Sequence, residues 1–211
     1  MNRTGDHSES LLLARNVHKS YGRKRVLNSV SIDIRPSEIV GIVGENGSGK
    51  STLLRILLGL TRPDLGELVV RSTVGYCPQE MTVFENLTVD ENIDYFGAAY
   101  GLSRNKSGDL AGRREMLLEQ FRFGQFRSSI VSNLSGGTKQ KLNLSLALLH
   151  DPGVLVLDEP YSGFDWETYL HFWELASSLR KSGTSCLVVS HLVYDHTKFD
   201  RIFELKDGRL H

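Results

Sequence analysis

The residues with the clearest chemical meaning form a glycine-rich run that ends in lysine and serine. Residues 44–51 read GENGSGKS, match the pattern G-x-x-x-x-G-K-[ST], and lie between an apolar stretch and a helical one. Glycines let backbone N–H groups approach a phosphate closely, and the N-terminus of the following helix adds donors. Lys50 would bring positive charge to the outer phosphates, and the Ser51 hydroxyl would ligate Mg²⁺. The run therefore predicts a nucleoside triphosphate site.

Two carboxylates form a second group of candidates. Asp158 and Glu159 directly follow the apolar residues 154–157, at the end of a strand where open α/β sheets collect their ligands. We expect Asp158 to lie beside Mg²⁺ and Glu159 to polarise the attacking water. Alone, an Asp-Glu pair after a strand is usually only solvated, so this interpretation depends on the phosphate loop.

The elements that must position these residues alternate between strands and helices. Residues 39–43, 154–157 and 186–189 read as buried strands, and residues 30–34 alternate as in a half-buried one. Helical stretches are expected at residues 50–58, 139–149 and 166–181. Strands that alternate with helices predict a largely parallel sheet.

The remaining segments complete the predicted organisation. Residues 67–76 read as one short strand, which Pro78 would interrupt. The helical pattern of residues 87–126 indicates an inserted subdomain, and residues 201–211 read as a final hairpin. The polar residues 1–10 lack the apolar core of a secretion signal and are expected to form a disordered leader.

Composition excludes several classes of protein. The 211 residues include 25 basic and 25 acidic side chains, so no global field attracts nucleic acid or anionic lipid. Cys77 and Cys186 are far apart and read as reduced core residues. No apolar run approaches the roughly 20 residues of a membrane-spanning helix. We therefore expect a cytoplasmic protein that reaches a membrane only through a partner.

Residues 133–140, which read NLSGGTKQ, resemble the signature motif of the ABC ATPases. Further residues stand in the order typical of that family, with Tyr21 as the adenine-stacking aromatic, Gln79 as the Q-loop glutamine, Asp165 as the D-loop aspartate and His191 as the switch histidine. The resemblance spans about residues 11–210. Within the family, the sequence is most similar to the exporter-type ATP-binding subunits of ABC transporters.

The resemblance implies an α/β fold: a P-loop NTPase core with a mainly parallel sheet, a small antiparallel β-subdomain and an inserted α-helical subdomain. The ABC ATPase domain would cover residues 11–211, with the helical insert at about 87–145. In the family, two such domains pair head to tail, so that Ser135, Gly136 and Gly137 of one cover the ATP of the other. A separate transmembrane permease subunit would contact Gln79 and the insert, and direct contact with nucleic acid is not expected.

The expected site residues fall into three sets. The catalytic residues are Glu159, His191, Gln79 and Lys50. The expected ligands of Mg²⁺ are Ser51, Gln79 and Asp158. The expected nucleotide-binding residues are Tyr21, Gly44, Glu45, Asn46, Gly47, Ser48, Gly49, Lys50, Ser51, Thr52, Ser135, Gly136, Gly137 and Asp165.

Several of these residues have a plainer interpretation. Tyr21 would by itself be a packed aromatic at a strand end, His191 a hydrogen-bonded histidine after a strand, and Gln79 a turn residue. Residues 23–25, RKR, read as a solvated turn rather than a nucleic-acid patch.

The sequence also departs from the family pattern. Thr138 stands where many members have glutamine, residues 161–165 form an unusual D-loop, and the interval from Lys50 to Gln79 is short, which indicates a trimmed β-subdomain. The leading hypothesis is an ATPase subunit that drives a transporter. One alternative is a soluble ABC ATPase that acts on ribosomes or DNA. The other is an inactive regulatory partner, which is disfavoured because Lys50, Asp158, Glu159 and His191 are all present.

Overall fold

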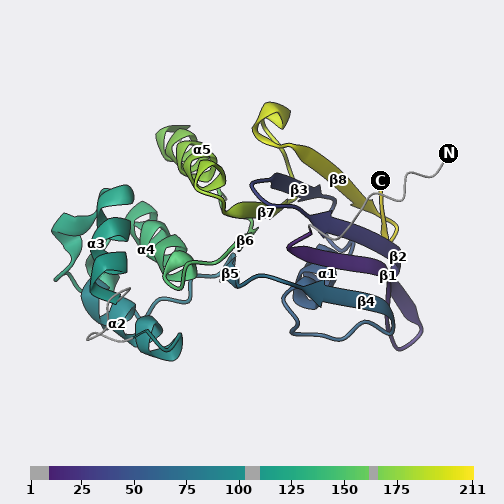
Figure 1. Cartoon of the computed structure of the whole chain (residues 1–211), viewed down its shortest axis with the longest axis horizontal. Helices are drawn as coiled ribbons and strands as arrows, with labels where there is room; N and C mark the ends of the chain where they lie inside the picture. Colours follow the sequence, from purple (N-terminus) through teal and green to yellow (C-terminus); the bar gives the residue numbers. More distant parts are fainter. Residues whose placement is uncertain (1–9, 103–109, 162–165) are drawn as a thin grey trace. The chain divides into compact units, whose positions relative to one another are not determined.

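The computed structural model describes residues 10–102, 110–161 and 166–211. The chain divides into two compact units (Figure 1). The first combines Met1–Tyr76 with Gly153–His211, and the second is formed by Cys77–Pro152. The predicted insert at residues 87–145 lies within the limits of the second unit.

The first unit contains a six-stranded sheet with the order β5-β6-β7-β3-β8-β9 in the part of the chain that is described. Its strands are β3 (Ile39–Val43), β5 (Val74–Cys77), β6 (Val154–Asp158), β7 (Ser185–Ser190), β8 (Arg201–Lys206) and β9 (Arg209–Leu210). Strands β6, β7, β3 and β8 run parallel to one another, and β9 is antiparallel to β8. This arrangement confirms the mainly parallel sheet and the final hairpin.

The central strands are apolar because both faces of the sheet are covered. Every residue of β7 is buried, as are all but the last residues of β3 and β6. The helix α1 (Lys50–Leu57) buries Leu53, Leu54, Ile56 and Leu57, and these side chains belong to the same core cluster as Val40, Val156 and Leu187. Helix α5 (Trp166–Lys181) contacts β7 and has the limits that the sequence predicts.

A second, antiparallel sheet has the order β2-β1-β4 and confirms the expected β-subdomain. It consists of β1 (Leu12–Tyr21), β2 (Lys24–Ile34) and β4 (Leu65–Val70). No strand is predicted at β1 from the sequence; there the pairing register shifts between Ala14 and Val17, and Asn16 has a positive φ of 48°. The single strand predicted at residues 67–76 is wrong, because β4 and β5 belong to different sheets.

A largely buried ion cluster joins β8 of the six-stranded sheet to β2, an edge strand of the antiparallel sheet. Arg201 of β8 donates to both carboxylate oxygens of Glu38 at 2.5 and 2.8 Å, and to Oδ1 of Asp33 at 3.0 Å. Burial alone would raise the pKa of Asp33, but the hydrogen bonds and charges of Arg201 and Arg35 outweigh it and lower that pKa. Asp33 is therefore held as a carboxylate at the end of β2.

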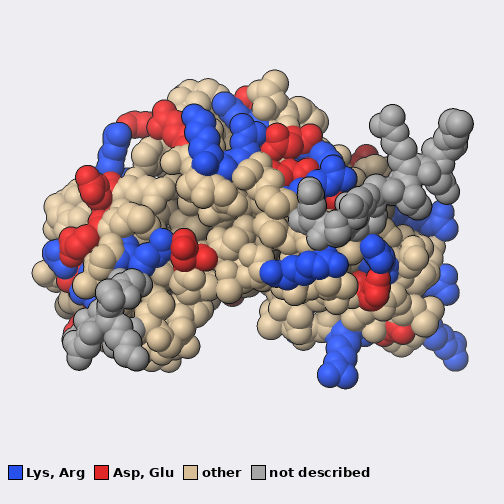
Figure 2. Space-filling model, viewed as in Figure 1, with Lys and Arg blue, Asp and Glu red and all other residues tan. Residues whose placement is uncertain are grey.

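The second unit is helical. It contains α2 (Val89–Ala99), α3 (Leu110–Gln120) and α4 (Gly136–Leu148), which Figure 1 draws in teal and green. Thr88 and Glu91 form a reciprocal capping box that starts α2. Arg127 bonds Asp90 at 3.0 Å and Glu115 at 2.9 Å, and so ties α2 to α3. None of the helices in the described ranges is both long and apolar enough to cross a bilayer. On the face that Figure 2 shows, basic and acidic side chains are interspersed.

Candidate active site

The phosphate loop connects β3 to α1 and is shaped by its glycines. Gly49 has φ 110° and precedes the first residue of α1, a conformation that other residues rarely adopt. At Gly44, an added Cβ would lie 2.5 Å from the carbonyl oxygen of Leu205, so only glycine fits beside β8. Nζ of Lys50 donates to the carbonyl oxygens of Gly44 at 2.5 Å and Glu45 at 3.1 Å. The ammonium group therefore lies over the loop that should bind phosphate.

The loop is open to a ligand. Glu45, Asn46, Gly47 and Ser51 are exposed, and the other residues from Ser48 to Thr52 are partly exposed. A hollow of about 250 Å³ lies on the flank of the loop, between residues 45–48 and residues 204–207. The first residues of α1 therefore have free access to solvent, as anion binding at a helix N-terminus requires.

The parallel strands bring the candidate residues to one edge of the sheet. Val43 pairs with Ser190, and Asp158 pairs with Val189. The start of the phosphate loop, the end of β6 and the end of β7 therefore lie at the same level. This edge is the carboxyl end of the strands, where ligands of open α/β sheets bind.

Glu159 is held in place by its backbone and by its side chain. Its φ is 49°, an uncommon value for a residue with a side chain, and its N–H donates to the carbonyl oxygen of Val189 at 2.8 Å. Its Oε2 accepts a bond from Oγ of Ser190 at 2.9 Å and lies 2.9 Å from Nδ1 of His191. The structure therefore brings the expected base and the expected switch histidine into direct contact.

Asp158 is half-buried at the end of β6. Its burial and the neighbouring charge of Glu159 raise its pKa, while a hydrogen bond with Tyr76 and the charge of Lys50 act in the opposite direction. The net effect disfavours the charged carboxylate. A cation at this position would relieve the repulsion between the two acids.

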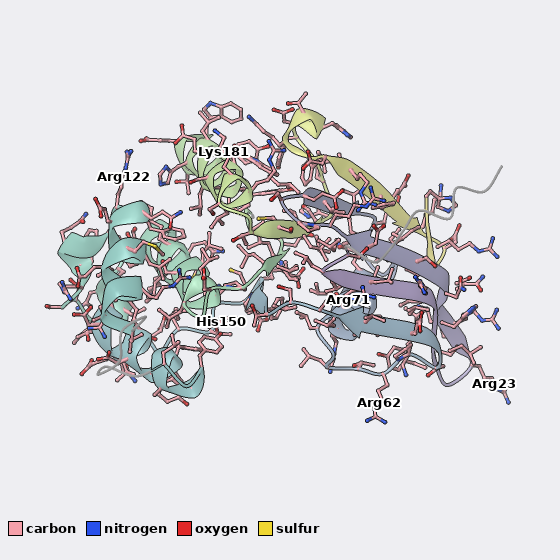
Figure 3. All side chains as sticks on the ribbon, viewed as in Figure 1. Arg23, Arg62, Arg71, Arg122, His150 and Lys181 are labelled. Carbon is pink, nitrogen blue, oxygen red and sulfur yellow. The ribbon has the colours of Figure 1, made fainter. Side chains whose placement is uncertain are left out.

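Tyr21 is the last residue of β1 and is 51% exposed, so the packed alternative does not fit. Nζ of Lys19 lies 5.7 Å from the centre of its ring. Arg23, Lys24 and Arg25 are exposed, but only Arg23 lies in the turn, because β2 begins at Lys24; Figure 3 shows Arg23 projecting from that turn. The ring of Tyr21 thus presents an open face of the kind that stacks on a base.

The other expected site residues belong to the second unit. Gln79 is exposed in a bend after β5. Ser135 is the N-cap of α4 and accepts a bond from the N–H of Thr138 at 3.2 Å, while Gly136 and Gly137 form the exposed first turn. The helix expected at residues 139–149 thus begins earlier, because Ser135 caps it and the glycines are helical. Asp165 lies outside the described residues.

Two contacts of the site were not found from the sequence. Ser190 donates to Glu159, and the hydroxyl of Tyr161 donates to the carbonyl oxygen of Leu192 at 3.0 Å. Serine at the end of a buried strand and tyrosine in an unusual D-loop carry no chemical signal of their own. Only the pairing of β6 with β7 brings them to the site.

The fold and the site together define a P-loop nucleotide-binding core, and comparisons with known proteins agree with it. The sequence profile of the ABC transporter family matches residues 27–162. The Nod factor export ATP-binding protein I of Burkholderia lata is 36% identical over 208 residues, which cover 92% of this chain and 67% of that protein. The ABC transporter G family member 20 of Dictyostelium discoideum is 32% identical over 208 residues, and the match covers 93% of this chain but only 28% of that protein.

A solved structure agrees with this similarity in sequence. A dimeric bacterial ABC transporter cassette superimposes with a TM-score of 0.82 at 26% identity, over 94% of this chain and 96% of that one. The chain therefore belongs to the ABC transporter family. It is the ATP-binding and ATP-hydrolysing cassette of that family, as the resemblance of its motifs predicts.

Proposed function

We propose that the chain powers a membrane transporter through ATP-driven closure of a pair of such cassettes. The observation that carries this proposal is the meeting of the phosphate loop, Asp158, Glu159 and His191 at one edge of the parallel sheet. Lys50 and the N-terminus of α1 bind the phosphates, and Tyr21 stacks on the adenine.

The hydrolytic step needs a base and a group that senses the outer phosphate. Glu159 is the base that polarises the attacking water, and its contacts with Ser190 and His191 hold the carboxylate in one orientation. His191 is 57% exposed in its side chain whereas Glu159 is 10% exposed, so the imidazole is the part of the pair that reaches toward a ligand.

The residues of this edge also fit Mg²⁺. Among the described residues, no three or more His, Cys, Asp and Glu side chains gather as a ready-made metal cluster. Mg²⁺ bound to a nucleotide does not require one, since it typically takes one or two protein oxygens together with water and phosphate. Ser51 and Asp158 would hold it, and when bound it would neutralise charge on the phosphates.

The partners are a second cassette and a separate transmembrane permease subunit. Ser135, Gly136 and Gly137 offer a hydroxyl and free N–H groups at the exposed start of α4, which suits a phosphate held by the other cassette. The chain would then lie at the cytoplasmic face of a membrane. The named relatives favour a transporter over a soluble machine, and the Nod factor protein favours an exporter.

Co-purification coupled to an ATPase assay tests this function. The tagged full chain is purified from detergent-solubilised native membranes, its membrane partner is identified by mass spectrometry, and phosphate release is measured for the complex. We expect a multi-spanning subunit in stoichiometric amount and an ATPase that Glu159→Gln abolishes. Recovery of ribosomal or DNA-bound partners in place of a membrane subunit would contradict the proposal.

A further inference from the structure

Tyr161 lies two residues after Glu159 and is almost fully buried, with 7% of its surface exposed. Its hydroxyl donates to the carbonyl oxygen of Leu192 at 3.0 Å. Leu192 directly follows His191, so the bond spans from the β6 side of the site to the segment after β7. A buried tyrosine hydroxyl normally requires such a partner.

The ring of Tyr161 is fixed by other aromatic side chains. It meets Tyr169, Phe172 and Trp173 of α5 at centroid distances of 5.6, 5.9 and 6.2 Å. Tyr194, on the segment after His191, packs against it at 6.2 Å. Tyr161 thus contacts this segment through its hydroxyl and also through its ring, and α5 packs against the same ring.

The segment that Tyr161 holds is the one that carries the switch histidine. His191 lies between Ser190, which donates to Glu159, and Leu192, which accepts from Tyr161. The N–H of Leu192 also lies 3.4 Å from Oγ of Ser190. A shift of Leu192 would therefore move His191 away from the carboxylate it contacts.

From this geometry we propose that Tyr161 is a positioning residue for ATP hydrolysis, whose hydroxyl anchors Leu192 and so holds His191 against Glu159. The inference rests on the proposed function, in which Glu159 and His191 act on ATP. Burial raises the pKa of Tyr161 to about 12, so the phenol keeps its proton and remains a donor at neutral pH. Tyr161 itself touches neither ATP nor the attacking water in this scheme.

A double-mutant cycle in the full chain tests the inference. Tyr161→Phe keeps the packed ring and removes the hydroxyl, and Tyr169→Phe removes a hydroxyl from the same aromatic cluster as a matched control. We expect Tyr161→Phe to lower kcat roughly 10-fold with little change in KM for MgATP, because a small misplacement of a catalytic group has effects of this order. The control should retain wild-type kcat.

Coupling to His191 separates this role from a merely structural one. His191→Ala should lower kcat strongly, and adding Tyr161→Phe to it should cause almost no further loss, since the anchored group is then absent. Wild-type kcat in Tyr161→Phe, or a full 10-fold loss also in the His191→Ala background, would overturn the inference. Wild-type kcat in His191→Ala would instead overturn the proposed role of His191, and the positioning role with it. Melting temperatures of all four variants verify that they fold.

Discussion

Nδ1 of His191 lies 2.9 Å from Oε2 of Glu159, although the two residues are 32 positions apart in the chain. The pairing of β6 with β7 produces this contact, because it places the ends of the two strands at one level. Ser190 donates to the same carboxylate oxygen. The acid and the imidazole are therefore oriented by the fold itself, which lowers the cost of ordering them when a substrate binds.

Replacing Glu159 by glutamine should stop hydrolysis and preserve binding. Glu159→Gln keeps the shape of the side chain but removes its basic charge, and loss of a general base is expected to lower turnover by about 10²-fold or more. ATP would then persist, and the variant should accumulate as an ATP-dependent dimer in size-exclusion chromatography with MgATP. Wild-type phosphate release would show that Glu159 is not the base. An inactive variant that also stays monomeric with its membrane partner present would contradict closure of the pair.

Replacing Lys50 by alanine should weaken both binding and turnover. The ammonium group lies over the phosphate loop, so Lys50→Ala removes the charge that faces the outer phosphates. We expect at least a tenfold rise in the Kd of MgATP measured by titration calorimetry, since a hydrogen bond to a charged group contributes about 1.5–3 kcal/mol. Lys181→Ala, at the exposed end of α5, is the matched control and should bind like wild type. Equal affinities for both variants would contradict the assignment.

Replacing Ser135 by arginine tests the composite site. Ser135→Arg places a bulky charge at the exposed N-terminus of α4, which should leave ATP binding to the same chain intact but abolish hydrolysis. The lost cap also costs about 1 kcal/mol of stability, so the melting temperature must be measured beside activity. Ser128→Arg adds the same charge to an exposed turn of the same unit and should remain active. Normal hydrolysis by Ser135→Arg would exclude a signature motif that acts across the dimer.

The ion cluster of Asp33 and Arg201 should make the free energy of unfolding depend on pH. The pKa of Asp33 is below its ordinary value of 3.8, so its stabilising contribution is complete above about that pH and is lost as pH falls through the lowered pKa. Asp33→Asn should therefore reduce the free energy of unfolding by about 2 kcal/mol at pH 7. The difference from wild type should shrink as pH is lowered below 3.8.

Urea denaturation at a series of pH values measures this difference, with the exposed Asp207→Asn as control. The control should follow the wild-type curve throughout. A deficit in Asp33→Asn that stays constant down to acid pH would show that the ion pair is not its cause.

Much of the parallel core was predictable because each of its elements carries its own pattern. Strands β3, β6 and β7 are continuous apolar runs, since both faces of the sheet are covered, and α5 has a helical spacing of apolar residues. The antiparallel sheet was harder to locate. In β1 the alternation is broken at Asn16, where the register shifts, so a period of two could not be read.

The site, too, has a part that the sequence predicts and a part that it does not. Lys50, Ser51, Asp158 and Glu159 follow strands in motifs whose chemistry is legible from residue type and order. The support around them depends on which strands are neighbours, and no motif gives that information. The hydrogen bond from Ser190 to Glu159 and the one from Tyr161 to Leu192 could therefore be found only from the three-dimensional structure.

Strands β5 and β6 are neighbours in the sheet, although residues 78–152 of the second unit lie between them in sequence. The chain therefore leaves the sheet and returns to it at adjacent positions. Insertions or deletions between these strands shift no residue of the sheet from one face to the other, whereas a single added residue inside β6 would turn Asp158 over. The helical unit can therefore change in length and sequence while Asp158 and Glu159 keep their register at the end of β6.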